Sequence, residues 1–367
     1  MENRLKMRMG IVGFCNLNIM QYLYKYTNIL DEENVEYDVI YWNRLGIEEE
    51  VNFKGNLIRY DVQMNTYQPF YKKLNNFIKY AIFLQKMIKK KRYDKLIILT
   101  TQTAIPICNV LLGKYKGNYI FDYRDITKEY KSTLYKKLVH RIINNSFSTM
   151  MSSQGFIDAL ELNNVKKIQI AHNTKCLEKS TYKAIINKID PVIKIVYWGI
   201  VRQKEHTKKV CDCFGGDSRF QLIFHGTGIY EQLDGYCKKK KYENIIFTGV
   251  YEQKDIQKFV NETDILHCIY ENDPETIPTI AVKAYDAIKY RLPILVNLDC
   301  QIEKFFNGVS GAFAIDIEEK KSADMVYEWY KQLNEICVDK DYQKLEDKVY
   351  QDDLKFIQKL KEYVNLI

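Results

Sequence analysis

Short runs of β-branched and aromatic residues alternate with longer amphipathic stretches along the whole chain. This alternation is typical of parallel sheets that carry helices on both faces, so the sequence predicts an α/β fold throughout. In the first half the predicted strands are 9–12, 35–42, 56–60, 95–99, 119–123, 149–152 and 168–171. The predicted helices of this half are 20–30, 71–90, 104–112, 131–143 and 155–162.

A second domain is expected after the polar segment 174–190, where Pro191 precedes a fresh apolar run. Its predicted strands are 193–197, 220–224, 245–248, 265–269, 294–296 and 312–315, and a long amphipathic helix, 342–364, follows them. We therefore divide the chain into domains 1–175 and 191–344. We expect the C-terminal helix, about 345–367, to pack back across the first domain.

The composition agrees with a two-domain globular protein, because 367 residues with 46% hydrophobic content exceed the size of one typical core. No stretch offers ~20 uninterrupted apolar residues, and the N-terminus lacks the apolar region of a signal peptide, so we expect a cytoplasmic protein. The nine cysteines include no CxxC pair. Neither a disulfide framework nor a metal site is therefore expected.

The formal charge of +8 comes partly from two basic runs, Lys89-Lys90-Lys91-Arg92 and Lys238-Lys239-Lys240-Lys241. Each run is explained by a solvated helix end or loop, or by attraction to an anionic surface such as a bilayer leaflet. No zinc-finger, RNP or basic-zipper pattern accompanies the charge, so nucleic-acid binding is not expected.

Several predicted strands end in glycine or in a polar cluster, which is where ligands bind to open parallel sheets. Gly13, Gly199, Gly226 and Gly228 stand at such ends. Glycine lets backbone N–H groups approach a phosphate closely, although the same residues also serve simply to turn the chain. Neither GxGxxG nor a P-loop is present, so a dinucleotide fingerprint is unsupported.

Two acidic residues bracket an arginine at the end of the predicted strand 119–123, in the order Asp122-Tyr123-Arg124-Asp125. One carboxylate can pair with the guanidinium while the other stays available for proton or hydroxyl chemistry. Ion pairing alone would also explain all three residues.

The most informative stretch is 274–296, which indicates a polar loop, a helix and a strand introduced by Pro293. Lys283 and Asp286 lie three positions apart on the predicted helix and share one face. In a cleft the cation would lie near phosphate oxygens and the carboxylate near ribose hydroxyls, whereas on an open surface they would form an ordinary ion pair.

An ordered set of short motifs resembles the C-terminal domain of GT-B glycosyltransferases, the two-Rossmann-domain enzymes that use nucleotide sugars. The motifs are Tyr197-Trp198-Gly199, Phe224-His225-Gly226-Thr227-Gly228, Thr263-Asp264-Ile265, Lys283-Ala284-Tyr285-Asp286-Ala287 and Leu292-Pro293-Ile294-Leu295-Val296. The set is most similar to the family-4-like, group 1 bacterial enzymes of capsular and surface polysaccharide synthesis. The resemblance implies two Rossmann-like domains facing each other across a cleft.

The resemblance also implies roles for individual residues. Asp286 stands where the family has a ribose-binding Glu. Lys283 and Tyr285 would lie in the same donor site, Gly199, Gly226 and Gly228 beside the nucleotide, and Gly13 opposite the pyrophosphate. A further Glu that contacts the donor sugar is replaced here by Pro278, which leaves Glu275 and Thr279 as neighbouring candidates. Arg202 and Lys204 would bind the diphosphate, and Asp122 or Asp125 would orient or deprotonate the acceptor hydroxyl.

The reaction implied is metal-independent, cofactor-free and retaining transfer of a sugar, with UDP as the commonest donor nucleotide, to a hydroxyl of a glycan or lipid-linked oligosaccharide. A lipid-linked acceptor would give the basic runs a use at an anionic membrane. Two alternatives remain open at this point. One is a nucleotide-sugar epimerase on the same fold, and the other is a non-catalytic GT-B-like subunit of another transferase.

Overall fold

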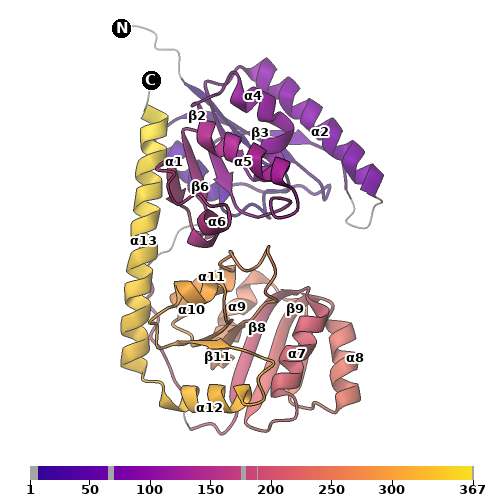
Figure 1. The fold of residues 1–367 in the computed structure, drawn as a ribbon, viewed down its shortest axis with the longest axis vertical. Helices are drawn as coiled ribbons and strands as arrows, with labels where there is room; N and C mark the ends of the chain where they lie inside the picture. The colour runs from indigo at the N-terminus through magenta and orange to yellow at the C-terminus, as the bar shows by residue number, and fades with distance from the viewer. Residues whose placement is uncertain (1–6, 65–69, 175–178, 188, 366–367) are drawn as a thin grey trace. The chain divides into compact units, whose positions relative to one another are not determined.

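The computed structural model describes residues 7–64, 70–174, 179–187 and 189–365. The chain forms two compact units, each an α/β structure (Figure 1). Unit 1 comprises Met1–Cys176 and Gln351–Ile367, and unit 2 comprises Leu177–Tyr350. The expected boundary near residue 175 falls on positions 175–178, which lie outside the described residues.

Unit 1 is built on a seven-stranded sheet in the order β3-β2-β1-β4-β5-β6-β7, and each neighbouring pair runs parallel. The strands are β1 (Arg8–Val12), β2 (Glu36–Trp42), β3 (Asn56–Tyr60), β4 (Lys95–Leu99), β5 (Tyr119–Tyr123), β6 (Ser148–Met151) and β7 (Ile168–Ile170). The strand order reverses between β1 and β4, which makes the carboxyl edge at this point a ligand-binding crevice in folds of this kind.

Alternating side chains of these strands enter two cores, as a period of two requires. One face packs on α2 (Phe70–Lys91), α4 (Cys108–Leu112), α5 (Thr133–Asn145) and α6 (Gln154–Ala159). The other face packs on α1 (Leu23–Glu32) and on the end of α13 (Glu335–Asn365). Between β4 and α4 lie α3 (Thr101–Ala104) and a 3₁₀ turn, η1 (Ile105–Ile107).

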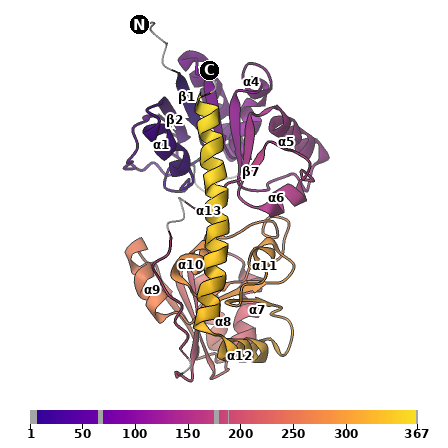
Figure 2. The same ribbon diagram turned by 90° about the vertical axis from the view of Figure 1, so that its left-hand side faces the viewer.

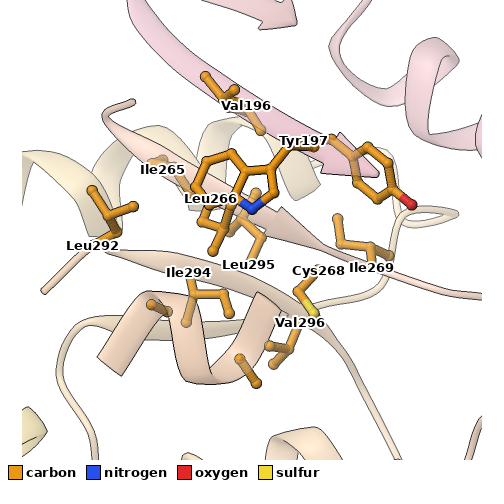
Figure 3. Packing of buried hydrophobic residues seen from close by; sticks show 14 of the residues in the cluster. Val196, Tyr197, Ile265, Leu266, Cys268, Ile269, Leu292, Ile294, Leu295 and Val296 are labelled. Carbon is orange, nitrogen blue, oxygen red and sulfur yellow. The ribbon is translucent and has the colours of Figure 1, made fainter. Parts of the chain in front are cut away.

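Unit 2 contains a six-stranded parallel sheet in the order β10-β9-β8-β11-β12-β13. The strands are β8 (Ile193–Val201), β9 (Phe220–Gly228), β10 (Ile245–Gly249), β11 (Ile265–Cys268), β12 (Ile294–Asn297) and β13 (Ala312–Ile315). The helices are α7 (Lys204–Phe214), α8 (Tyr230–Lys240), α9 (Ile256–Glu262), α10 (Val282–Tyr290), α11 (Gln301–Phe305) and α12 (Ser322–Gln332), with a 3₁₀ turn, η2 (Gln253–Asp255), before α9. Figure 3 shows the core between the sheet and its helices at Val196, Leu266 and Leu295.

β8 and β9 continue four residues beyond their predicted ends at 197 and 224. Gly199 pairs with Gly226 and Val201 with Gly228 in this extension. A Cβ atom at Gly226 would lie 1.8 Å from the carbonyl oxygen of Gly199, and one at Gly228 would lie 2.0 Å from that of Val201. Both glycines also have positive φ, so no other residue fits this close strand pairing without strain.

α13 is a continuous helix of 31 residues that contributes to both units (Figure 2). Val338, Tyr342 and Val349 are buried in the core of unit 2. Phe356, Leu360 and Tyr363 are buried in the core of unit 1. Its charged residues also pair inside each unit, because Glu346 accepts from Arg291 at 2.8 Å and Asp353 from Lys25 at 2.6 Å.

Candidate functional site

The strand order of unit 2 reverses between β8 and β11, so the loops that follow these two strands diverge at the carboxyl edge of the sheet. The Gln203 side chain joins the two loops, since its Oε1 accepts a hydrogen bond of 3.0 Å from the backbone N–H of Glu271. This hydrogen bond links the two loops, and the side chains around them form the first candidate site.

Lys283 lies at the reversal point, in the first turn of α10. Its Nζ is 4.2 Å from the centroid of the Tyr197 ring and 5.6 Å from that of Tyr270. The same atom lies 3.1 Å from the place that a Cβ of Gly199 would take. Two aromatic rings thus hold the Lys283 ammonium beside the backbone of Gly199. Because Gly199 has no side chain, an anion can approach the ammonium there.

Asp286 lies one turn further along α10, and its Oδ2 accepts a hydrogen bond of 3.0 Å from the indole N–H of Trp198 in β8. Burial raises the pKa of this carboxyl above its usual range, while the Trp198 hydrogen bond and the charge of Lys283 oppose the shift. The aspartate is therefore oriented by the strand beneath it, with one oxygen engaged by Trp198.

Two more cations stand at the same edge. Arg202 directly follows β8, and Lys204 is the first residue of α7. Both side chains are exposed. Together with Lys283 they give the reversal point of unit 2 three positive groups, an electrostatic setting suited to a diphosphate.

His267, which the sequence analysis did not single out, lies in β11 near Lys283. It is 2% exposed, and its Nδ1 accepts a hydrogen bond of 3.1 Å from the backbone N–H of Ile269. Burial, reinforced by the charges of Lys283 and His206, lowers its pKa to about 3. The imidazole therefore stays neutral at physiological pH. In the sequence, this residue could be noticed only as a histidine inside an otherwise apolar strand.

The remaining donor-side candidates make other contacts within unit 2. Tyr285 is 3% exposed and packs edge-to-face on Phe305, so its ring belongs to the core of unit 2, and its part in the donor site stays a prediction. Glu275 is exposed in the loop before α10, where its backbone N–H bonds to Asp273. Thr279 bonds through its hydroxyl to the carbonyl of Thr276 in the same loop. Gly226 and Gly228 have the structural explanation given above, the close pairing of β8 with β9.

At the carboxyl edge of unit 1, the structure separates the two candidate carboxylates. Asp122 is fully buried in β5, and both of its oxygens accept from Arg124, one also from the hydroxyl of Tyr26. The Arg124 guanidinium also donates to the carbonyl of Ala171 at 2.6 Å. Asp122 is therefore a buried ion-pair partner, and its action on an acceptor stays a prediction.

Asp125 is exposed just beyond the strand. Burial raises the pKa of the nearby Cys15 and Tyr22, and the charge of Asp125 adds a small part to both shifts. Gly13 directly follows β1 at the same edge, with its N–H donating to the carbonyl of Ile40 and its own carbonyl accepting from the Tyr80 hydroxyl. Of the two carboxylates, Asp125 is thus the one that solvent reaches.

A polar run at residues 100–103, which was not predicted as part of a site, lies directly after β4 at the strand reversal of unit 1. The hydroxyls of Thr100, Thr101 and Thr103 and the Oε1 of Gln102 are buried, and none has a hydrogen-bond partner within the described ranges. Thr100 has φ 71°, a strained value for a β-branched residue. Buried hydroxyls without partners are costly, so this run is suited to a polar ligand that would satisfy them. Four polar residues after an apolar strand were the available signal.

No group of three or more His, Cys, Asp or Glu side chains is arranged to hold a metal ion in the part of the chain that the structure describes. Within the same ranges, no helix is both long and apolar enough to span a bilayer.

Two parallel Rossmann-like sheets of seven and six strands, each with a polar carboxyl edge, define this chain as a GT-B fold, the architecture expected from the sequence. No protein-family profile matches the chain, and no curated protein matches it in sequence. Solved structures match over nearly its full length.

One match is the lipopolysaccharide outer core galactosyltransferase WaaB, with TM-score 0.68, 11% identity, and coverage of 96% of this chain and 99% of that one. Another is sucrose-phosphate synthase from Thermosynechococcus elongatus, with TM-score 0.70, 10% identity and coverage of 97% and 98%. A third is HepE of Anabaena in complex with UDP, with TM-score 0.64, 10% identity and coverage of 97% and 100%. At such identities the likeness establishes the fold.

Proposed function

We propose that this protein is a glycosyltransferase that moves a sugar from a nucleotide diphosphate donor to an acceptor hydroxyl. The observation that carries the proposal is the pair formed by Lys283 and Asp286 at the strand reversal of unit 2. Lys283 lies over two aromatic rings against Gly199, and Asp286 is oriented by Trp198 one helical turn away. A cation next to a carboxylate suits a ligand that carries phosphates at one end and vicinal hydroxyls at the other.

In this proposal Lys283, Arg202 and Lys204 bind the diphosphate, and Asp286 accepts hydrogen bonds from the ribose. The charge that develops on the leaving diphosphate during transfer is then stabilised by these three cations and by the first N–H groups of α10. We take UDP as the donor nucleotide, supported by HepE, whose structure holds UDP on the same fold. Metal-independent transfer with retention of anomeric configuration completes the donor half of the proposal.

On the acceptor side we assign Asp125 and the polar run 100–103. Asp125 is the exposed carboxylate at the edge of unit 1, and it would accept the proton of the attacking hydroxyl. The unpartnered hydroxyls of the run would bind the other hydroxyls of a glycan. A glycan or lipid-linked oligosaccharide of a bacterial surface polysaccharide is the acceptor class we propose, supported by the fold shared with WaaB.

Thermal denaturation with a panel of UDP-, GDP- and TDP-sugars tests the donor site. UDP or a UDP-sugar should raise the Tm of the wild type. At a ligand concentration of 100 times Kd, binding adds about 2.7 kcal/mol to the free energy of unfolding. Lys283→Ala and Asp286→Ala should lose this shift. Lys289→Ala, an exposed lysine on the same helix, is the matched control and should keep it. If no nucleotide shifts the Tm of the wild type, the proposed donor site is wrong.

Product analysis separates transfer from the two alternatives. Incubation with the stabilising nucleotide sugar and an oligosaccharide acceptor should release the nucleotide and extend the acceptor, and Asp125→Ala should slow this while keeping the nucleotide-induced Tm shift. Conversion of the donor to an epimer without acceptor would identify an epimerase. Nucleotide binding with neither product, under conditions where the acceptor panel is broad, would favour a non-catalytic subunit.

A further inference from the structure

α2 presents an unusual surface to solvent. Its inner face is buried through Tyr80, Leu84 and Ile88, as a helix packed on a sheet requires. Its outer face, however, also carries large apolar side chains. These are Tyr71, Leu74, Ile78 and Ile82, which are 67%, 47%, 52% and 63% exposed.

The four exposed side chains form a continuous line, because spacings of three and four residues return to the same face of a helix. Four exposed lysines run beside this apolar stripe on one flank, namely Lys72, Lys79, Lys86 and Lys90. The helix has 22 residues and contains no Asp or Glu. An apolar line bordered by cations, without any carboxylate, is the pattern of a helix that lies in a lipid–water interface.

A pocket continues the same face at the C-terminal end of α2. Its volume is about 720 Å³, and its lining includes Lys89, Lys90, Arg92 and Lys114. Gln85 and Lys89, which continue the stripe by helical spacing after Ile82, also line it. None of the described residues that line it is Asp or Glu. Such a pocket suits a phosphate group, and its place beside the stripe suits a phosphate attached to an acyl chain.

The cations of the pocket are directed to solvent rather than used for folding. Lys91, between them, is turned to Asp38, with 3.6 Å between Nζ and Oδ2. Lys89, Lys90 and Arg92 are exposed, and Lys114 lies over the ring of Tyr115 at 5.0 Å. Figure 1 shows α2 as a long helix at the margin of unit 1, so this face is carried by one element.

We propose that the outer face of α2 is a docking surface for an anionic phospholipid bilayer. The stripe of Tyr71, Leu74, Ile78 and Ile82 enters the headgroup region, the flanking lysines face the lipid phosphates, and the basic pocket binds one phospholipid headgroup. Area and charge act together in such binding, so neither feature alone is sufficient. This inference does not depend on the proposed transferase activity.

Vesicle co-sedimentation of the full-length protein tests the surface. The wild type should bind vesicles of 30% phosphatidylglycerol in phosphatidylcholine and not pure phosphatidylcholine vesicles, and binding should weaken as NaCl is raised from about 50 to 500 mM. The variant Ile78→Glu with Ile82→Glu should bind anionic vesicles at least tenfold more weakly. Lys89→Glu with Lys114→Glu should also lose at least tenfold.

Two control variants carry the same changes on unit 2. Ile189→Glu with Ile336→Glu alters apolar residues that are 95% and 77% exposed, and Lys239→Glu with Lys240→Glu alters the other basic run. Both controls should bind vesicles like the wild type. Thermal denaturation with and without UDP checks that every variant is folded and that the donor site is unaffected.

Three outcomes would overturn the proposal. One is a wild type that does not bind anionic vesicles at low salt. Another is a stripe variant that binds as well as the wild type, since this would reduce the interaction to adsorption by charge alone. The third is a pocket variant that loses binding to RNA or heparin while its vesicle binding is unchanged, which would identify a polyanion rather than a bilayer.

Discussion

Asp122 provides the sharpest test of how the edge of unit 1 is built. Its carboxylate is fully buried and accepts from Arg124 through both oxygens, with the Tyr26 hydroxyl as a further donor. Asp122→Asn keeps the shape of the side chain and removes its charge. The Arg124 guanidinium, 4% exposed, would then remain buried without a carboxylate, beside the carbonyl of Ala171 and the Tyr22 ring.

Removing one partner of a buried ion pair costs about 3–5 kcal/mol, because the other charge is left uncompensated. Since the amide oxygen introduced by Asp122→Asn would still accept one hydrogen bond, we expect the lower end, about 3 kcal/mol. For a unit of this size, that corresponds to a fall in Tm of roughly 6–12 °C. Asp125→Asn, which changes an exposed carboxylate three residues later, should alter stability by less than about 0.5 kcal/mol.

Differential scanning calorimetry of the two single variants, and of Asp122→Asn combined with Arg124→Met, measures these effects. The double variant should recover most of the lost stability, because no unpaired charge remains buried. The reasoning is refuted if Asp122→Asn unfolds within about 2 °C of the wild type in this assay, which corresponds to a loss of about 1 kcal/mol or less. An Asp122→Asn protein of normal Tm but without transfer activity would support the prediction that Asp122 is a catalytic residue.

Two further predictions concern unit 2. Burial lowers the pKa of His267 to about 3, below the unfolded value near 6.5, so its neutral form stabilises the fold above pH ~6.5 and this stability is lost as the pH falls. At pH 4.5 the loss of stability is about 2.7 kcal/mol. When Tm is measured from pH 7.5 to 4.5, it should therefore fall less steeply in His267→Asn than in the wild type. Equal slopes in the two proteins would contradict the lowered pKa of His267. Gly226→Ala places a Cβ 1.8 Å from the Gly199 carbonyl oxygen and should cost about 2–5 kcal/mol in urea unfolding. Gly235→Ala in α8, where nothing lies within 4 Å, should be neutral or stabilising, and similar losses in both variants would refute the role of strand pairing.

The fold class was predictable because its signal is local. Short runs rich in apolar residues, such as 95–99, 119–123 and 312–315, are strands in the structure with the predicted bounds. The extension of β8 and β9 was not predictable in the same way. It depends on Gly199 and Gly226 lying opposite each other, which is a tertiary contact between residues 27 positions apart along the chain.

The candidate site was predictable only in part, since spacing gives the face of a helix but not what that face meets. The helix that carries Lys283 and Asp286 was predicted and is present as α10. The burial of Tyr285 on the same helix follows from how α10 packs on the sheet, which no spacing reveals. Likewise, the order Asp122-Tyr123-Arg124-Asp125 leaves open which carboxylate pairs with the arginine. β5 settles this, because Asp122 is still in the strand and Asp125 is past its end.

α2 was difficult for a related reason. Its residues 71–90 were predicted as a helix, but apolar side chains occur on both of its faces, so the pattern does not say which line is buried. Only the packing of Tyr80, Leu84 and Ile88 on the sheet identifies the outer line as the exposed one.

Because α13 contributes side chains to the cores of both units, it affects the order in which the units can fold during synthesis. The core of unit 1 includes Phe356, Leu360 and Tyr363, and the buried Lys25 is paired with Asp353. A nascent chain that has passed residue 176 therefore still exposes the apolar surface these side chains cover and leaves Lys25 without its carboxylate. Unit 2 is continuous in sequence through Tyr350 and can complete its core first. The N-terminal unit is thus the later of the two to mature, and a fragment ending near residue 176 is a poor choice for expression.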